Sequence, residues 1–376
     1  MAKLKIVMYG LTSEGYKLAG RLVEKTSVTI VDETLQMAMD LDSGFLKKNP
    51  NLEELMSEEP LLGVKPLEKV LGEAQVIFFT PKLRRPSDES VVEAGIKLRD
   101  LARYLSKGAV FVNTLPTGPG GNSENIMLLE KQTGLRVGES LTYSYMPLRP
   151  GGAEPDIVSS AGGRESGILG TLGFSQSSPN VFSAELDYVS SFLEPSLRTV
   201  TEIELAKKAR EARITLQRAK ETYIDEFTGY LYDLKAVQAR EETGEPVSYL
   251  AGATVKSLEN FGRYVVDEAR EVLKEKELKA SRTKVSVLWT LDKYEMRADR
   301  LQMAESIQQR LRDYVTDVDI IAGSKVVGVT DSLDPLKYNL VIVCSERDRE
   351  FLRQAKRGRR NIEMISLLAT PGLKRE

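Results

Sequence analysis

The sequence predicts an α/β protein in which two parallel-sheet domains flank a region of long helices. Short apolar runs alternate with segments of helical periodicity up to about residue 195, and the same alternation returns after residue 280. Strands that are apolar at nearly every position are typical of parallel sheets covered on both faces. We therefore expect a first domain at 1–195, a central helical region at 196–280 and a smaller α/β domain at 281–376.

The first 33 residues predict a strand, a turn, a helix and a second strand. Apolar runs at 3–9 and 28–31 have strand character, and 16–25 places apolar residues at helical spacing between them. A βαβ unit of this kind is the usual opening of a dinucleotide-binding domain of the Rossmann type. In such a domain the pyrophosphate rests on the N-terminus of the helix.

The glycine fingerprint of such a turn is present in altered form. The pattern G-x-G-x-x-G is represented by Gly10, Thr12 and Gly15, so a β-branched side chain stands where the backbone must approach a phosphate closely. Asp32 ends the second strand, where an acid accepts hydrogen bonds from the adenosine ribose. These four residues are the predicted core of a cofactor site, and Asp32 with Glu33 favours NAD over NADP because both would repel a 2′-phosphate.

The rest of the first domain continues the alternation. A polar helical region follows Asp32, and apolar strands are then expected at 76–79, 109–112, 141–145 and 157–160, with helices from 66 and over 88–105. Ligands in parallel sheets bind outside the carboxyl ends of the strands, which places the turns at Gly10, Asp32, Thr80 and Asn113 at one edge. The glycine-rich loop at 113–121 is a candidate phosphate cradle, although it lacks the ending of a P-loop.

The second half of the chain reads as long helices and then a second α/β pattern. Helices are expected at 200–234 and 248–279 from apolar positions mostly three or four apart. Strands are then expected at 284–289, 318–322 and 340–344, with helices at 300–314 and 347–356. This order implies parallel strands joined by right-handed crossovers.

Composition excludes several classes of function. The net charge is −2, which argues against nucleic acid as the main partner, and no apolar run is long enough to span a membrane. The chain has one cysteine, Cys344, and no histidine, so a disulfide framework, a histidine-dependent triad and most zinc sites are excluded. We expect a cytoplasmic protein that binds no metal.

Several strings occur in the order found in the UDP-glucose/GDP-mannose dehydrogenase family, and the chain resembles that family over most of its length. They are Gly10-Leu11-Thr12-Ser13-Glu14-Gly15-Tyr16, Glu59-Pro60-Leu61, Thr80-Pro81 with Asp88, Asn113-Thr114-Leu115-Pro116-Thr117-Gly118, Pro147-Leu148-Arg149-Pro150-Gly151, Glu204-Leu205-Ala206-Lys207 and Asp299-Arg300. The resemblance implies a Rossmann-type first domain, a homodimer built on the central helix, and oxidation of a nucleotide sugar with NAD. It adds Thr80 and Pro81 to the cofactor-binding residues and gives Thr114 and Lys207 catalytic positions beside the substrate.

The chain departs from the family at the nucleophile. The family carries a G-G-x-C segment after the central helix, and no counterpart occurs between Thr228 and Lys279. Cys344 lies instead in an apolar strand, where a buried and inert thiol is expected. Without a thiolate, oxidation to an acid by the family route is not expected.

Two functions remain open from the sequence. The first is an NAD-dependent oxidoreductase acting on an alcohol or carbonyl of a nucleotide sugar or other small molecule, limited to a two-electron step, with Thr114 and Lys207 facing the substrate. The second is a catalytically inactive dimeric relative that binds a nucleotide, a nucleotide sugar or a protein partner. Asp32, Thr114 and Lys207 favour the first, and Thr12 and the missing cysteine favour the second.

Overall fold

The chain forms two compact units in a computed structural model that describes residues 3–57, 66–85, 89–161, 167–212, 214, 223–239, 244–321, 333–356 and 362–366. The first unit comprises Met1–Phe192, Lys235–Ser248 and Asp292–Ala298, and the second comprises Leu193–Leu234, Tyr249–Leu291 and Asp299–Glu376. Neither unit is one continuous stretch of chain. The short segment Asp292–Ala298 therefore belongs to the first unit although both of its neighbours belong to the second.

The first unit is built on a seven-stranded sheet with the strand order β3-β2-β1-β4-β5-β6-β7. The five central strands are parallel, and the edge strands β3 and β7 are antiparallel to their neighbours. The inner strands are buried along almost their whole length, as expected for a parallel sheet covered on both faces. The strands are β1 Lys5–Tyr9, β2 Ser27–Asp32, β3 Met37–Leu41, β4 Val76–Phe79, β5 Val110–Asn113, β6 Thr142–Tyr145 and β7 Ser159–Ser160.

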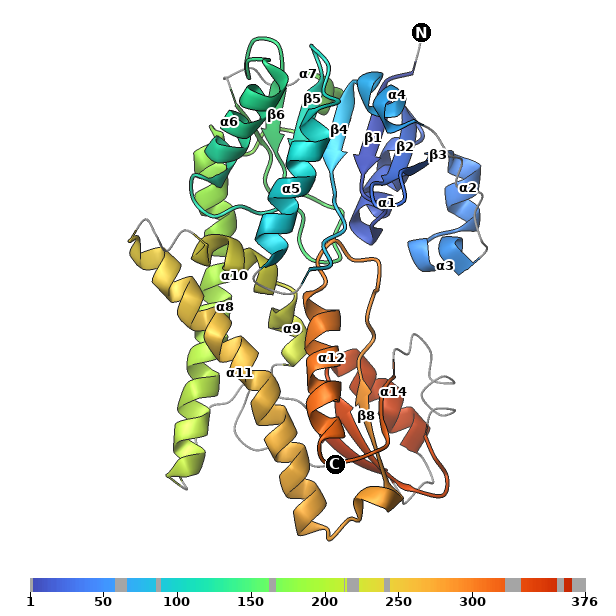
Figure 1. Ribbon diagram of the computed structural model, residues 1–376, viewed down its shortest axis with the longest axis vertical. Coiled ribbons are helices and arrows are strands. Elements are labelled where there is room, and N and C mark those ends of the chain that lie inside the picture. Colours follow the sequence, from blue (N-terminus) through green and yellow to red (C-terminus); the bar gives the residue numbers. More distant parts are fainter. Residues whose placement is uncertain are drawn as a thin grey trace. The chain divides into compact units, whose positions relative to one another are not determined.

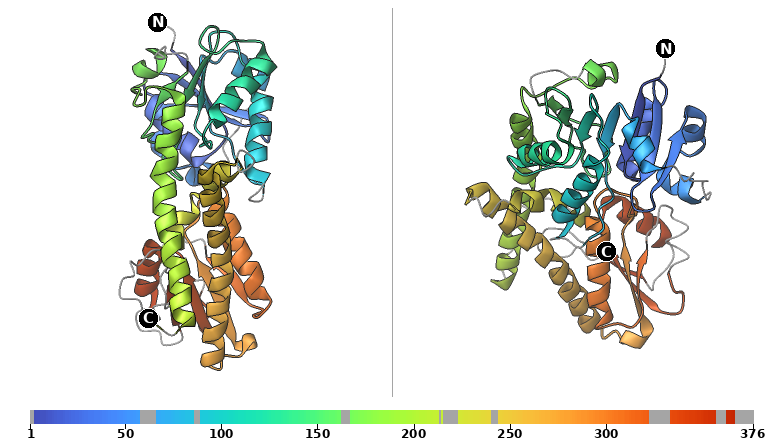
Figure 2. Two further views of the ribbon diagram at one scale, coloured as in Figure 1. Left: turned by 90° about the vertical axis from the view of Figure 1, so that its left-hand side faces the viewer. Right: turned by 45° about the horizontal axis from the view of Figure 1, so that its top comes forward.

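Helices connect the parallel strands of this sheet. The crossovers from β1 to β2 and from β4 to β5 run in opposite directions along the sheet, so right-handed connections put α1 (Ser13–Leu22) and α5 (Ser90–Ala102) on opposite faces. Helix α6 (Gly121–Thr133) packs beside α5, as Figures 1 and 2 show. Shorter helices complete the unit: α2 Ser43–Lys48, α3 Leu52–Ser57, α4 Leu67–Gly72 and α7 Gly167–Thr171.

Two elements of the first unit differ from the sequence-based prediction. The region after Asp32 was expected to be helical, but β3 forms there and pairs with β2 across a short turn in which Gln36 has a φ of 52°. Helix α6 was not predicted, because only Gly121, Asn122 and Leu129 of its residues are buried and its apolar pattern is correspondingly weak. Glycines with left-handed φ values stand at both of its ends.

The long helices begin earlier and are more divided than predicted. Helix α8 runs from Val181 to Glu211, with Pro195 inside it, and its first 12 residues belong to the first unit. The expected single helix over 200–234 is therefore wrong, because α9 (Ile224–Thr228) and α10 (Leu231–Gln238) are separate helices. Helix α11 (Pro246–Glu275) matches the second predicted helix closely.

The second unit contains a four-stranded parallel sheet with the order β11-β10-β8-β9. Helices α12 (Asp299–Arg312) and α14 (Glu346–Lys356) connect its strands, and Figure 1 shows both beside β8. Tyr223 lies in the apolar core of this unit with residues from three strand ends and α14. The strands are β8 Thr283–Leu288, β9 Val318–Ile321, β10 Tyr338–Val343 and β11 Ile362–Ser366.

The predicted fold class is thus confirmed: a Rossmann-type parallel sheet, long central helices and a smaller α/β unit. No helix within the described ranges combines the length and apolar character needed to cross a membrane. The strings at Glu59-Pro60-Leu61 and Asp88 lie outside the described residues.

Candidate functional site

The turn after β1 is built by close packing against the end of β4. Gly10 has a φ of 131°, and a Cβ atom there would stand 1.8 Å from the carbonyl oxygen of Thr80 and 2.9 Å from the Cα of Pro81. A Cβ on Gly15 would stand 2.8 Å from Oγ1 of Thr80. Only glycine fits at Gly10 without moving backbone, so the first and third positions of the predicted fingerprint have the steric role that a close turn requires.

Thr12, the irregular member of that fingerprint, caps the helix that follows. It is fully buried, and its hydroxyl accepts a hydrogen bond from the backbone N–H of Gly15 at 3.2 Å. The same hydroxyl donates to the carbonyl oxygen of Thr80 at 3.2 Å. The side chain therefore turns into the base of the turn and acts as the N-cap of α1.

Another part of the chain lies on the N-terminus of α1. We call Asp292–Ala298 the strap. The backbone N–H of Ser13, in the first turn of α1, donates to the carbonyl oxygen of Tyr294 at 2.8 Å. Glu14 is fully buried, and its carboxylate accepts from the backbone N–H of Met296 at 2.9 Å and from that of Gly151 at 2.9 Å. The helix end thus carries a carbonyl oxygen and a carboxylate from the chain itself.

The segment after β4 also binds the strap. The backbone N–H of Leu83 donates to the carbonyl oxygen of Met296 at 2.8 Å. The guanidinium of Arg84 donates to the carbonyl oxygens of Lys293 at 2.8 Å and Glu295 at 2.9 Å. Burial lowers the pKa of Arg84 from its ordinary value, with opposing contributions from nearby glutamates.

Asp32 lies at the end of β2, as the sequence predicts. Its carboxylate bonds to the backbone of the turn that follows it. Its side chain is nearly buried, and one carboxylate oxygen accepts from the backbone N–H groups of Thr34 at 2.9 Å and Leu35 at 3.0 Å. An aspartate that bonds to amides two and three residues ahead stabilises a turn locally. This turn leads into β3.

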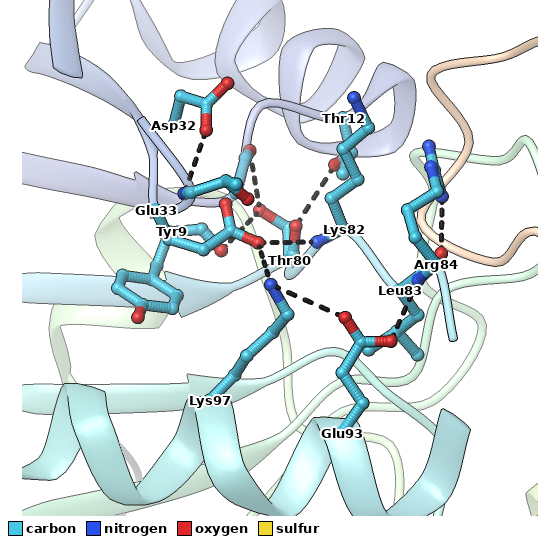
Figure 3. A network of polar contacts seen from close by, with 12 residues as sticks. Tyr9, Thr12, Asp32, Glu33, Thr80, Lys82, Leu83, Arg84, Glu93 and Lys97 are labelled. Carbon is cyan, nitrogen blue, oxygen red and sulfur yellow. Dashed lines mark hydrogen bonds and ion pairs between the residues drawn. The ribbon is translucent and has the colours of Figure 1, made fainter. Parts of the chain in front are cut away.

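The neighbouring Glu33 lies at the centre of a buried ionic network, which Figure 3 shows. Its Oε1 accepts from the backbone N–H of Lys82 and from the ammonium of Lys97, each at 2.9 Å. The side chains of Glu33 and Lys97 are only 3% and 16% exposed, so the pair is screened weakly. Glu93 lies 3.8 Å from the same ammonium and accepts from the backbone N–H of Arg84 at 2.8 Å. The network fixes the loop after β4 to α5.

The ammonium of Lys82 lies 5.5 Å from the centre of the Tyr294 ring, within cation–π range. Burial, followed by the charge of Arg84, lowers the pKa of Lys82 from its ordinary value, while Asp32 and Glu33 oppose that shift. A positive group thus stands beside the strap.

These residues do not fit a bound dinucleotide in this arrangement. A pyrophosphate needs free N–H groups at the helix end and an absence of negative charge. Here the Ser13 N–H is used by Tyr294, and Glu14 places a buried carboxylate at the same helix end. The structure therefore gathers Gly10, Thr12, Gly15, Thr80 and Pro81 at one turn, as predicted, with a strap of the chain lying over it.

The glycine-rich loop at 113–121 does cradle an anion, and the anion is a side chain of the same unit. Glu185, from α8, is 1% exposed and accepts from the backbone N–H groups of Gly120 at 2.7 Å and Asn122 at 2.6 Å. The amide of Asn122 and the hydroxyl of Thr117 also donate to it, at 2.8 and 3.1 Å. The N-terminus of α6 is thereby satisfied internally.

The two predicted catalytic residues lie in different units, and each has partners of its own. Thr114 is fully buried, and its hydroxyl lies 2.5 Å from the Phe79 carbonyl oxygen and 3.8 Å from the Met296 sulfur. Lys207, on α8 in the second unit, donates to Glu204 at 2.9 Å, with its ammonium 5.9 Å from the centre of the Tyr264 ring. Their roles beside a substrate remain predictions.

Cys344 is a buried thiol at the end of β10, as expected. Burial, followed by the charges of Asp348 and Asp225, raises its pKa well above the ordinary thiol value. Asp348 is itself fully buried and accepts from Thr290 and Ser345, and burial raises its pKa as well. The described residues contain no group of acids and cysteine arranged to hold a metal ion.

Sequence reasoning missed Glu14, Glu185 and the strap. An acid one residue before the last glycine of the fingerprint was the available signal for Glu14, because it puts negative charge where a pyrophosphate belongs. Nothing local marks Glu185 or the strap, since their partners lie far away in the sequence.

Comparison with solved structures identifies proteins of the same fold. A UDP-D-ManNAc dehydrogenase from Pyrococcus horikoshii is similar with a TM-score of 0.60 and 16% identity, over 96% of this chain and 95% of that one. A UDP-glucose dehydrogenase from Pyrobaculum islandicum gives 0.58 and 14%, over 98% and 94%. The Staphylococcus aureus UDP-N-acetyl-mannosamine dehydrogenase Cap5O gives 0.56 and 12%, over 90% and 88%.

No protein-family model matches the sequence, and no curated protein matches it significantly. The chain therefore has the fold of UDP-sugar dehydrogenases at low sequence identity, and the resemblance inferred from the ordered strings is confirmed at the level of the fold.

Proposed function

We propose that this chain is a catalytically inactive relative of the nucleotide-sugar dehydrogenases that binds a nucleotide sugar or a protein partner without oxidising it. One observation carries the proposal: the N-terminus of α1, where the fold would receive a dinucleotide, is occupied by the Tyr294 carbonyl oxygen and the Glu14 carboxylate. An oxidation of an alcohol needs a hydride acceptor, and this crevice is where the fold would place one.

The surroundings of the other reactive groups support the same function. The Thr114 hydroxyl is engaged with the backbone of β4 in a fully buried position. The thiol of Cys344 is also fully buried, and its raised pKa opposes formation of the thiolate that a covalent route requires. Neither side chain is poised to act on a substrate as it stands.

A two-electron NAD-dependent oxidoreductase is the second candidate, and the intact turn favours it. Gly10 and Gly15 keep the close packing of a dinucleotide-binding turn, and Asp32 keeps its place at the end of β2. In that case NAD would accept the hydride from the substrate. Asp32 and the N-terminus of α1 would hold the NAD molecule. This function requires the strap to leave the helix end first.

Ligand-induced stabilisation of the wild-type chain separates the two candidates. NAD, NADP, UDP-glucose and GDP-mannose would each be tested by thermal shift and by calorimetry, because a ligand at 100 times its Kd stabilises a fold by about 2.7 kcal/mol. We expect no response to either dinucleotide. A response to a nucleotide sugar would identify the ligand class, and no response to any of the four would favour a protein partner.

Binding of NAD accompanied by reduction of its nicotinamide in the presence of a sugar nucleotide would overturn the proposed function. Binding of NAD without turnover would leave the chain inactive but would contradict the closed crevice. Formation of an acid product would further contradict the assignment of Cys344 as inert.

We also propose that the chain forms a homodimer and is cytoplasmic. Two exposed apolar side chains one turn apart on α8 support self-association: Phe182 is 52% exposed and Leu186 is 45% exposed. Sedimentation of the wild type against a Phe182→Ser, Leu186→Ser double variant tests it. Loss of the dimer in the variant is expected, and a monomeric wild type would contradict the proposal.

A further inference from the structure

Glu14 is the residue on which the strap and the helix end converge. Both of its carboxylate oxygens are used: Oε1 accepts from the backbone N–H of Gly151 and Oε2 from that of Met296. The side chain and its bond to Met296 are buried, so water does not replace the carboxylate as the partner of that amide. A carboxylate in the first turn of a helix is also favoured by the helix dipole, which strengthens this placement.

Two other charged side chains hold the strap at points away from the α1 end: Arg84 donates to the carbonyl oxygens of Lys293 and Glu295, and Arg297 of the strap donates to that of Leu148 at 2.9 Å. The other bonds of the strap to the turn and to the loop after β4 run through the backbone groups of Ser13 and Leu83. Hydrogen bonds to a charged group are roughly twice as strong as neutral ones. Loss of the Glu14 carboxylate would leave the buried Met296 amide without its acceptor and remove the partner of the half-buried Gly151 amide.

Thr12 does not hold the strap as Glu14 does. Its hydroxyl bonds to Gly15 and Thr80 within the turn, and no bond joins it to the strap among the described contacts. A glycine at position 12 would therefore restore the fingerprint without freeing the helix end.

We propose that Glu14 closes the dinucleotide crevice of the first unit by tying the strap to the N-terminus of α1, so that exclusion of a dinucleotide depends on Glu14 and not on Thr12. This inference rests on the proposed function and goes beyond it, because it assigns the closure to one side chain. It also identifies the strap as an internal occupant of a site that the fold offers to a ligand.

Amide hydrogen exchange tests the closure without any ligand. The variants are Glu14→Ala, the near-isosteric Glu14→Gln, Thr12→Gly, and a control, Glu24→Gln, which changes an exposed acid just beyond the same helix. We expect the Met296 and Gly151 amides to exchange at least about tenfold faster in Glu14→Ala, because a charged hydrogen bond to each is lost. Thr12→Gly and Glu24→Gln should leave both rates within about twofold of the wild type when compared at equal global stability.

Calorimetry with NAD and with ADP supplies the second measurement. The wild type and Thr12→Gly should show no heat of binding, and Glu14→Ala should bind both ligands. Unchanged exchange at Met296 in both Glu14 variants would overturn the inference while leaving the proposed function intact. NAD binding to the wild type would overturn the proposed function, and the exchange rates would still decide whether Glu14 holds the strap.

Gain of NAD binding in Thr12→Gly equal to that of Glu14→Ala would also overturn the inference, because the threonine would then be the determinant. If Glu14→Ala does not fold, Glu14→Gln provides the comparison, since its single carbonyl oxygen can take the place of only one of the two carboxylate oxygens and at least one of the Met296 and Gly151 amides loses its acceptor. The wild type alone offers a further check: rapid exchange of the Met296 amide in the folded protein would contradict the closure.

Discussion

At the scale of single residues, a glycine in the turn before α1 and a glycine in the last turn of α1 are expected to respond in opposite ways to substitution by alanine. A Cβ at Gly10 would stand 1.8 Å from the Thr80 carbonyl oxygen, and its φ of 131° is a conformation that other residues rarely adopt. We expect Gly10→Ala to destabilise the first unit by roughly 3 kcal/mol, from the clash and the backbone strain together. Denaturant unfolding followed by circular dichroism measures this change.

Gly20 is the matched control, because it lies inside α1 and a Cβ there would meet nothing within 4 Å. Gly20→Ala should stabilise the protein by about 0.5 to 1 kcal/mol, since alanine loses less conformational freedom in a helix. Equal destabilisation by both substitutions would show that the close packing at Gly10 is not the cause.

The pair of Lys97 and Glu33 gives a second residue-scale prediction. Lys97→Met leaves the Glu33 carboxylate, only 3% exposed, without its cation, and should cost about 3 kcal/mol of unfolding free energy. Adding Glu33→Gln should recover part of that loss, because the uncompensated charge is then gone. Strict additivity of the two changes in a double-mutant cycle would contradict a direct coupling.

Individual residues of the turn could be predicted from sequence, while their partners could not. Gly10 and Asp32 could be predicted because they belong to a local sequence pattern whose geometry is fixed by neighbouring residues. The role of Glu14 depends on hydrogen bonds from the backbone amides of Gly151 and Met296, which lie 137 and 282 positions away in the sequence. An acid in the first turn of a helix is favourable in any protein, so its presence alone does not reveal such contacts.

At the scale of elements, α6 depends on a carboxylate supplied by another helix. Glu185 satisfies the N–H groups of Gly120 and Asn122 at the start of α6. Glu185→Gln should destabilise the first unit by about 3 kcal/mol, because the replacement amide has an N–H facing N–H donors and loses the charge. Thermal unfolding and exchange of the first α6 amides measure the effect.

Glu194→Gln on the same helix is the control for this prediction. Its side chain is 71% exposed and pairs with Arg198 at the surface, so its loss should change stability by no more than about 0.5 kcal/mol. A similar small change for Glu185→Gln would mean that α6 has other means of satisfying its first turn.

Strands were predictable as elements because their burial is visible as unbroken apolar runs. The run at 76–79 coincides with β4, and β5 and β10 are offset from their predictions by one or two residues. The antiparallel strand β3 was missed because its residues, Met37–Leu41, include an exposed Asp40 and follow a turn that depends on the Asp32 side chain. Tertiary pairing with β2 decides that segment, and local periodicity does not.

At the scale of the whole molecule, the single cysteine gives a direct measure of opening in the second unit. Cys344 is fully buried, and its pKa is raised by burial and by two aspartates. We expect negligible reaction with iodoacetamide in native buffer and complete reaction in denaturant, because only the exposed thiolate is nucleophilic. Rapid labelling of the folded chain would contradict the buried position.

The same shift has a consequence for stability at alkaline pH. The folded thiol stays protonated where the unfolded one has ionised, so the contribution of Cys344 is constant at low pH and declines once the pH exceeds the ordinary thiol value of about 8.5. Comparison of the wild type with Cys344→Ala at neutral and alkaline pH isolates this contribution. The difference in unfolding free energy between the wild type and Cys344→Ala should decrease as the pH rises.

The burial of Trp289 determines how ligand binding to this protein has to be observed. It is the one tryptophan of the chain, it is fully buried, and its indole N–H donates to Asp225 within the second unit. Intrinsic tryptophan emission is thus an optical signal of that unit, while every predicted cofactor-binding residue belongs to the other. Unchanged tryptophan emission during addition of a dinucleotide would therefore not test whether Glu14 excludes the dinucleotide. A Tyr294→Trp variant would give the strap an emission of its own.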